Sequence, residues 1–250
     1  MSYPSPLNAV ARKLNDQVAI LSCPFLRVKL LQIGARSSFI TLPSQALVVH
    51  APLPYDAQSE EIVAGRPVKY LIAPDFEHHM ALKSWKDKFP DAVVIGVTGL
   101  KARKAPQGVV VDYEVAEANK VLSAADFGIQ DPDLAEFQFV YLPAFPNKEL
   151  VTFHKPTRTI FQADLLMTFP LTEQYSKVPS SENGRLTPLF KKALATKRFQ
   201  RMLVSDAASA TAGLKAVQSL DFDTIVPCHG EVAAGDGRTV FEKYFEQFLA

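Results

Sequence analysis

The alternation of short apolar runs with helical segments between residues 46 and 97 is the feature that most constrains the fold. The apolar runs are residues 46–50, 68–73 and 93–97. Each is short enough to be a strand that is buried on both faces. The segments between them, 56–64 and 82–89, space their apolar residues at helical intervals. Because this order is typical of parallel sheets layered with helices, the segment predicts an α/β fold.

The rest of the chain adds further strands and helices to this unit. Strands are predicted at residues 25–31, 37–42, 137–142, 150–154, 159–163 and 224–226. Helices are predicted at residues 187–201, 205–220 and 240–249, the last with a strong apolar stripe. Residues 98–136 have weak periodicity and are predicted as loops with one short helix.

We expect a single domain over residues 1–250, because 48 % of the chain is hydrophobic and domains reach roughly this size. Residues 1–20 are expected to form an N-terminal extension. Residues 168–186 contain prolines, serines and Gly184, a composition typical of a loop. This loop is either a lid over a site or an insertion.

The balance of charge restricts the classes of partner. Lysine and arginine total 27 and aspartate and glutamate total 26, so the formal net charge is +1. This near-balance argues against binding to nucleic acid or to a membrane through a polybasic surface, and favours a small-molecule substrate. Two cysteines are too few for a disulfide framework, and no apolar run has the length of a signal peptide core or a membrane span. We therefore expect a cytoplasmic protein; the sequence carries no signal of oligomeric state.

Four residues that can bind a metal directly follow predicted buried strands. His78 and His79 follow the strand that ends at Ala73, while Asp164 and His229 follow two later strands. Ligand sites in layered α/β folds gather at the carboxyl ends of strands, so these side chains are candidates for one metal site. Each is also compatible with a plainer role, since a histidine pair can start a helix and an aspartate after a strand can cap a turn.

Three segments that contain these residues resemble the metallo-β-lactamase superfamily. They are residues 73–79 (APDFEHH), 161–166 (FQADLL) and 226–231 (VPCHGE), in this order. More narrowly, they are similar to a branch of the superfamily defined only as a domain of unknown function, DUF4336. The resemblance covers roughly residues 25–249, and it implies a four-layer αββα sandwich with a metal site at one edge of two sheets.

The superfamily signature, His-x-His-x-Asp-His, is only partly present. Laid over this chain, it places Pro74 and Phe76 at its first two histidines, His78 at its aspartate and His79 at its last histidine. A further family histidine is missing near residues 144–146. One of the two metal positions of the superfamily has therefore lost its nitrogen ligands. The other position retains a donor at each place: His78, His79, Asp164 and His229.

This pattern predicts one divalent metal. Imidazoles and a carboxylate suit Zn²⁺ first, with Fe²⁺ or Mn²⁺ as alternatives. A bound metal would lower the pKa of a water toward ~7 and provide hydroxide for hydrolysis of a small ester, lactone or thioester. Asp75 or Glu77 would act as the general base or would fix the tautomer of a histidine ligand.

Two other functions remain open from the sequence. The four residues can form a vestigial polar cluster in a non-catalytic binding protein that has the metallo-β-lactamase fold. The chain can also be a mononuclear-iron oxygenase, although in that case the superfamily uses the ligand set that is missing here. A measurement of bound metal distinguishes the non-catalytic binding protein from a hydrolase. Iron-dependent oxygen uptake would identify the oxygenase.

Overall fold

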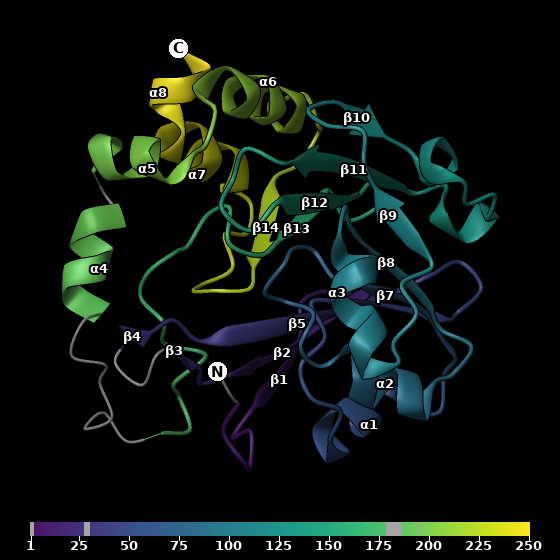
Figure 1. Ribbon diagram of the computed structural model, residues 1–250. Coiled ribbons are helices and arrows are strands. Elements are labelled where there is room, and N and C mark those ends of the chain that lie inside the picture. The colour runs from purple at the N-terminus through teal and green to yellow at the C-terminus, as the bar shows by residue number, and fades with distance from the viewer. Residues whose placement is uncertain (1–2, 28–30, 179–186, 195) are drawn as a thin grey trace.

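A computed structural model describes residues 3–27, 31–178, 187–194 and 196–250. Within these residues the chain forms two mixed β-sheets that pack face to face, with helices on both outer sides (Figure 1). The predicted α/β four-layer αββα sandwich is thus confirmed. No helix in the described part of the chain combines the length and the apolar character needed to cross a membrane.

The larger sheet has seven strands in the order β1-β2-β5-β6-β7-β8-β9. Their bounds are β1 Val10–Lys13, β2 Val18–Cys23, β5 Ala35–Thr41, β6 Leu47–His50, β7 Val68–Ile72, β8 Val93–Val97 and β9 Tyr113–Val115. The first four strands pair antiparallel, and β6 to β9 pair parallel. The parallel half contains the strand–helix alternation predicted over residues 46–97, with helices α1 (Ala57–Val63) and α2 (Leu82–Lys88) as the crossovers.

The smaller sheet has five strands in the order β10-β11-β12-β13-β14. Their bounds are β10 Val121–Leu122, β11 Phe137–Leu142, β12 Glu149–His154, β13 Thr159–Gln162 and β14 Thr224–Pro227. All neighbours pair antiparallel except β13 and β14, which pair parallel. A separate two-stranded ribbon joins β3 (Leu26–Arg27) to β4 (Leu31–Gln32).

The remaining helices are α3 Leu100–Lys104, α4 Thr187–Leu194, α5 Lys197–Leu203, α6 Ala207–Gln218, α7 Gly237–Tyr244 and α8 Glu246–Leu249. Of these helices, α3 packs on the larger sheet beside β8, and α6, α7 and α8 cover the outer side of the smaller sheet. Three short 3₁₀ turns, at Ala105–Gln107, Ala124–Phe127 and Pro132–Leu134, complete the described elements. Figure 1 shows α6, α7 and α8 together above the smaller sheet, with α4 and α5 at its side.

The layers follow from the alternation of side chains along each strand. In β5, Phe39 joins the core beneath α1 and α2, whereas its neighbour Ile40 joins the core between the two sheets. In β11, Phe139 faces the core between the sheets and Val140 faces the core beneath α6 and α7. Each sheet is therefore buried on both faces, which explains why its strands are continuous apolar runs rather than alternating ones.

Three predicted regions differ in the structure. The expected N-terminal extension, residues 1–20, contains β1 and the first half of β2. Strand β1 is an edge strand with mostly exposed side chains, so its sequence lacks an apolar pattern. Residues 98–136 contain β9 and β10, which are too short to show periodicity. The helix predicted over 187–201 is two helices, with Thr196 capping the second through the Phe199 N–H.

Candidate metal centre

The edge where the two sheets meet brings the candidate residues together. Strands β13 and β14 pair parallel with Gln162 opposite Pro227, so Asp164 and His229, each two residues further on, leave the sheet at the same edge. The loop after β7 reaches this edge because the Phe76 N–H donates to the Asn147 carbonyl. This loop carries His78 across from the larger sheet.

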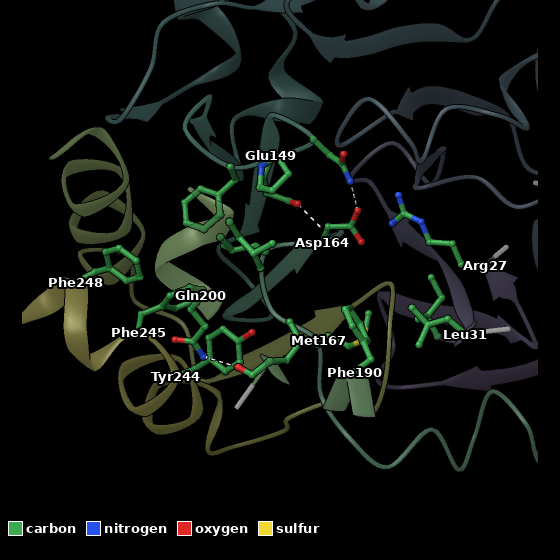
Figure 2. A pocket seen from close by; sticks show the side chains of 17 residues that line it. Arg27, Leu31, Glu149, Asp164, Met167, Phe190, Gln200, Tyr244, Phe245 and Phe248 are labelled. Carbon is green, nitrogen blue, oxygen red and sulfur yellow. Dashed lines mark hydrogen bonds between the residues drawn. The ribbon is translucent and has the colours of Figure 1, made fainter. Parts of the chain in front are cut away.

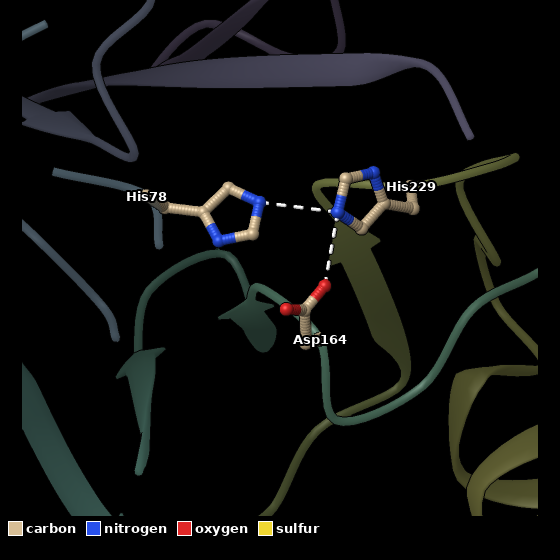
Figure 3. A group of neighbouring side chains, drawn as sticks. All are labelled: His78, Asp164 and His229. Atoms are coloured by element: carbon tan, nitrogen blue, oxygen red, sulfur yellow. Dashed lines mark hydrogen bonds and ion pairs between the residues drawn. The ribbon is translucent and has the colours of Figure 1, made fainter. Parts of the chain in front are cut away.

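His78, Asp164 and His229 form a compact group (Figure 3). One ligand atom from each lies within 4.8 Å of the others. The two Nε2 atoms of the histidines are 3.1 Å apart, and His229 Nε2 is 3.0 Å from Asp164 Oδ1. His229 is buried, and the other two residues are partly buried. Of the four metal ligands predicted from the sequence, the structure therefore brings three together.

Asp75 orients His78. Its carboxylate is fully buried and lies 2.9–3.0 Å from His78 Nδ1, while Oδ1 also accepts the main-chain N–H groups of Glu77 and His78. Because a carboxylate only accepts hydrogen bonds, Nδ1 carries the proton of the ring and Nε2 faces the group. Asp75 therefore contacts the side of the ring away from the site, which is the position of a tautomer-fixing partner rather than of a general base.

The Gly34 carbonyl orients His229. It lies 2.8 Å from Nδ1, and because a carbonyl only accepts, this nitrogen also carries the ring proton. Gly34 has φ of +65°, and a Cβ there would lie 2.0 Å from Oε1 of Gln174, so only glycine fits. Gln174 in turn holds the His229 loop, because it donates to the Cys228 carbonyl and accepts the Gly230 N–H.

Asp164 is held by two residues from the start of β12. Asn147 donates to Oδ2, and the buried carboxylate of Glu149 accepts the main-chain N–H groups of Ala163 and Asp164. Burial would raise the pKa of Asp164, but the adjacent His78 and His229 rings and the Asn147 amide lower it below its usual range. Asp164 therefore presents an ionised Oδ1 to the group.

The group therefore brings three hydrogen-bond acceptors together. When both rings are neutral, each Nε2 atom has a lone pair, since each ring's proton is on Nδ1, and Asp164 Oδ1 lies beside them. Acceptors at this separation repel unless a cation lies among them. Burial disfavours charge on His78, but Asp75 and Asp164 outweigh it and raise the pKa of His78 to about 10. A second proton on the His78 ring lies on Nε2, where it takes the place that a metal cation would occupy among these acceptors.

The separations also fit a metal ion. Two ligands about 2.0–2.1 Å from a tetrahedral zinc are roughly 3.3 Å apart, close to the 3.0 and 3.1 Å found here. A small cavity of about 20 Å³ adjoins the group and is lined by all three residues and by Glu77. That volume is sufficient for about one water molecule. The residues present therefore fit one divalent metal with an adjacent small ligand.

His79 does not belong to the group. It follows His78 in a tight turn, where successive side chains point in different directions, and its carbonyl accepts from the buried Lys104 Nζ. Both ring nitrogens are buried and have no partner among the described residues. Burial, Lys104 and Arg103 lower the pKa of His79 to about 4, so its ring is neutral. Among the described residues, the compact group thus contains three of the four predicted ligands, and His79 lies outside it.

Several residues that shape the site were not found by sequence reasoning. Gly34, Asn147 and Glu149 act through hydrogen bonds to His229 or to the Asp164 segment. Gly34 lies 195 positions before the histidine that it orients, and no spacing rule links the two. One feature of the sequence could have pointed to Glu149, because it is a charged residue directly before a predicted apolar strand.

The predicted loop at 168–186 is described as far as residue 178. Its hydrogen bonds tie it to the His229 loop, since Thr168 Oγ1 donates to the Glu231 carbonyl and the Thr172 N–H donates to the Glu231 carboxylate. Residues 179–186, which contain the rest of the predicted lid or insertion, lie outside the described residues.

Solved structures that match this fold include metallo-β-lactamases. The enzyme from Erythrobacter litoralis is 12 % identical with a TM-score of 0.63, and the enzyme from Hirschia baltica is 11 % identical with a TM-score of 0.61; each match covers 96 % of this chain and 97 % of the other. FIM-1 from Pseudomonas aeruginosa, solved in its mono-zinc form, is 10 % identical with a TM-score of 0.59 over 97 % of both chains. No protein-family model and no curated protein sequence matches the chain. The chain therefore has the metallo-β-lactamase fold, established by structure at low sequence identity.

Proposed function

We propose that the protein is a hydrolase of a small ester, lactone or thioester that uses one divalent metal held by His78, Asp164 and His229. The observation that carries this proposal is the meeting of three acceptor atoms, two Nε2 and one Oδ1, about 3 Å from their neighbours. Each is oriented by a separate hydrogen bond behind it. Such oriented, convergent acceptors are typical of metal ligands.

The bound metal would supply Lewis acidity, which polarises a carbonyl and lowers the pKa of an adjacent water. In hydrolysis the water oxygen bonds to the acyl carbon, the bond to the leaving oxygen or sulfur breaks, and the water's proton passes to the leaving group. Glu77 lines the small cavity beside His78 and is placed to take and return that proton. Asp75 keeps Nε2 of His78 directed at the site.

Zinc is the metal we propose, because two imidazoles and a carboxylate are among its usual ligands. The fold neighbour FIM-1 was solved in a mono-zinc form, which supports one zinc as a workable complement for this architecture. Membership of the DUF4336 branch and a cytoplasmic location remain proposals based on the sequence motifs and composition.

Metal analysis of untagged protein tests the proposal. We expect about one zinc per chain by plasma mass spectrometry and its loss in His78→Ala. The adjacent variant His79→Ala is the matched control, because it removes a buried imidazole outside the group and should keep the metal. Loss of metal in the control but not in His78→Ala would refute the assigned ligands.

Activity of the zinc-loaded protein forms the second part of the test. Acyl esters, lactones and thioesters are assayed with the wild type and with Glu77→Gln, which should retain zinc and lose turnover. A protein that stays folded without metal in any preparation would instead support a binding role with a vestigial site.

A further inference from the structure

A second, larger cavity adjoins the candidate metal centre. It has a volume of about 270 Å³ and is lined mainly by apolar side chains of α4, α5, α7 and α8 and of residues 31–33, 145–149 and 164–167. Figure 2 shows Met167, Phe190, Tyr244 and Phe245 around it. A cavity of this size and lining matches the sites that hold the apolar part of small organic ligands.

The two cavities meet at three residues. Arg27, Ile33 and Asp164 line both the large cavity and the small one beside the metal ligands. A molecule lying in the large cavity can therefore reach Asp164, at the group proposed to hold the metal. In Figure 2 the Arg27 guanidinium is turned toward Asp164 at this end.

Arg27 differs from the other polar residues of the lining. Glu149 accepts two main-chain N–H groups, Asn147 donates to Asp164, and Gln200 donates to the Leu194 carbonyl. Among the described residues, the Arg27 guanidinium has neither a hydrogen bond nor an ion pair, although the residue is partly buried. Five N–H donors at the junction of two cavities are thus available to a ligand oxygen.

We propose that the large cavity binds the apolar acyl chain of the substrate and that Arg27 binds its acyl oxygen. The carbonyl to be hydrolysed then lies at the junction, and the small cavity beside the metal ligands has room for the attacking water. The product is a carboxylate with an apolar chain, and its two oxygens fit the guanidinium fork. Arg27 is a substrate-binding residue for the acyl oxygen, and the cavity selects acyl compounds with medium-length chains.

The catalytic meaning of this inference rests on the proposed hydrolase function, but binding of the product does not require a metal. Straight-chain carboxylates are therefore the probes, from acetate to dodecanoate, titrated calorimetrically into metal-free protein. Each buried methylene should tighten binding about fourfold, at about 0.8 kcal/mol, until the cavity is full. Acetate should show no binding.

Two variants and one matched control test the assignment. Arg27→Gln should weaken decanoate binding about tenfold or more and leave decanol binding unchanged, because only the carboxylate needs the charge. Met167→Trp fills the cavity and should abolish binding of decanoate while hexanoate still binds. Arg201→Gln removes an exposed arginine of α5 that lies outside the cavity and should behave as wild type.

The outcomes separate the two proposals. Absence of a chain-length dependence, or decanoate binding that is equal in the wild type and in folded Arg27→Gln, overturns the acyl-cavity assignment whether or not the protein holds zinc. Chain-length-dependent binding that needs Arg27 supports it, even if no hydrolysis is found and the proposed catalytic function fails. Thermal melts by circular dichroism show which variants are folded. If Met167→Trp does not fold, the comparison of the wild type with Arg27→Gln decides the test.

Discussion

Asp75→Asn tests whether the hydrogen bond behind His78 controls metal affinity. In the wild type, Asp75 Oδ2 is 2.9 Å from His78 Nδ1, and Oδ1 accepts the main-chain N–H groups of Glu77 and His78 at 2.8 and 2.6 Å. Asparagine keeps an oxygen for these two N–H groups but places an NH₂ donor opposite the Nδ1–H donor. The loop should keep its shape while His78 loses its charged partner.

The expected loss can be derived from this geometry. A hydrogen bond to a charged group contributes about 1.5–3 kcal/mol. Its removal should weaken zinc binding by roughly 10–100-fold, the range found when a partner behind a metal-binding histidine is removed. A competition titration against a coloured zinc chelator measures this change, and thermal unfolding of the metal-free variant measures the fold separately.

Asp87→Asn is the matched control for this variant. Asp87 pairs with Lys83 on the surface of α2, and both side chains are more than half exposed. Its substitution should leave zinc affinity unchanged, because exposed ion pairs contribute little. If Asp75→Asn binds zinc as tightly as Asp87→Asn while His78→Ala does not bind it, the proposed role of Asp75 is refuted.

Three further predictions concern the fold. Gly230→Ala should lower the free energy of unfolding in urea by at least about 3 kcal/mol, because its Cβ would lie 1.8 Å from the Thr168 carbonyl oxygen. Gly235 has a similar positive φ but open space around it, so Gly235→Ala should lower the free energy of unfolding by only about 1–2 kcal/mol. Equal losses would refute the steric argument. Trp85→Ala, which removes a fully buried side chain and its N–H···O bond, should cost about 3–5 kcal/mol by the same measurement, and a loss below about 1 kcal/mol would contradict its core role. Burial lowers the pKa of His154 from 6.5 to about 4, so as the pH falls the unfolded chain takes up a proton at this histidine before the folded protein does. The free energy of unfolding should therefore decrease by about 3 kcal/mol between about pH 6.5 and 4. His154→Gln should lose this part of the pH dependence, and an unchanged pH profile in the variant would contradict the assignment.

Most of the fold could be predicted from local patterns. The runs at 46–50, 68–73 and 93–97 are strands β6 to β8, because strands buried on both faces need apolar residues on both sides. The missed strands β1, β9 and β10 are edge strands of four, three and two residues, and none has enough buried positions to produce a pattern. Strand β2 was also missed, although its residues are almost all buried. The places of β1 and β9 in the larger sheet depend on their pairing with strands β2 and β8.

The candidate site was predicted in part, because only some of its features are local properties of the sequence. The position of a side chain after a buried strand is a local property, so His78, Asp164 and His229 were found from the sequence, as was the neighbouring pair Asp75 and Glu77. Which of two adjacent histidines faces the site is not a local property. It depends on the turn at residues 76–81 and on Asp75, which holds the ring of His78.

The sequence by itself determined the α/β class, the alternation of strands and helices over residues 46–97 and the residue types that can bind a metal, because these are properties of neighbouring residues. Only the tertiary structure decided that His79 is excluded, that Gly34 and Asn147 orient the ligands, and that an apolar cavity with Arg27 at its mouth adjoins the site. Those features join segments far apart in the chain, such as residues 34 and 229. Their proximity results from the packing of two sheets, and sequence spacing carries no record of it.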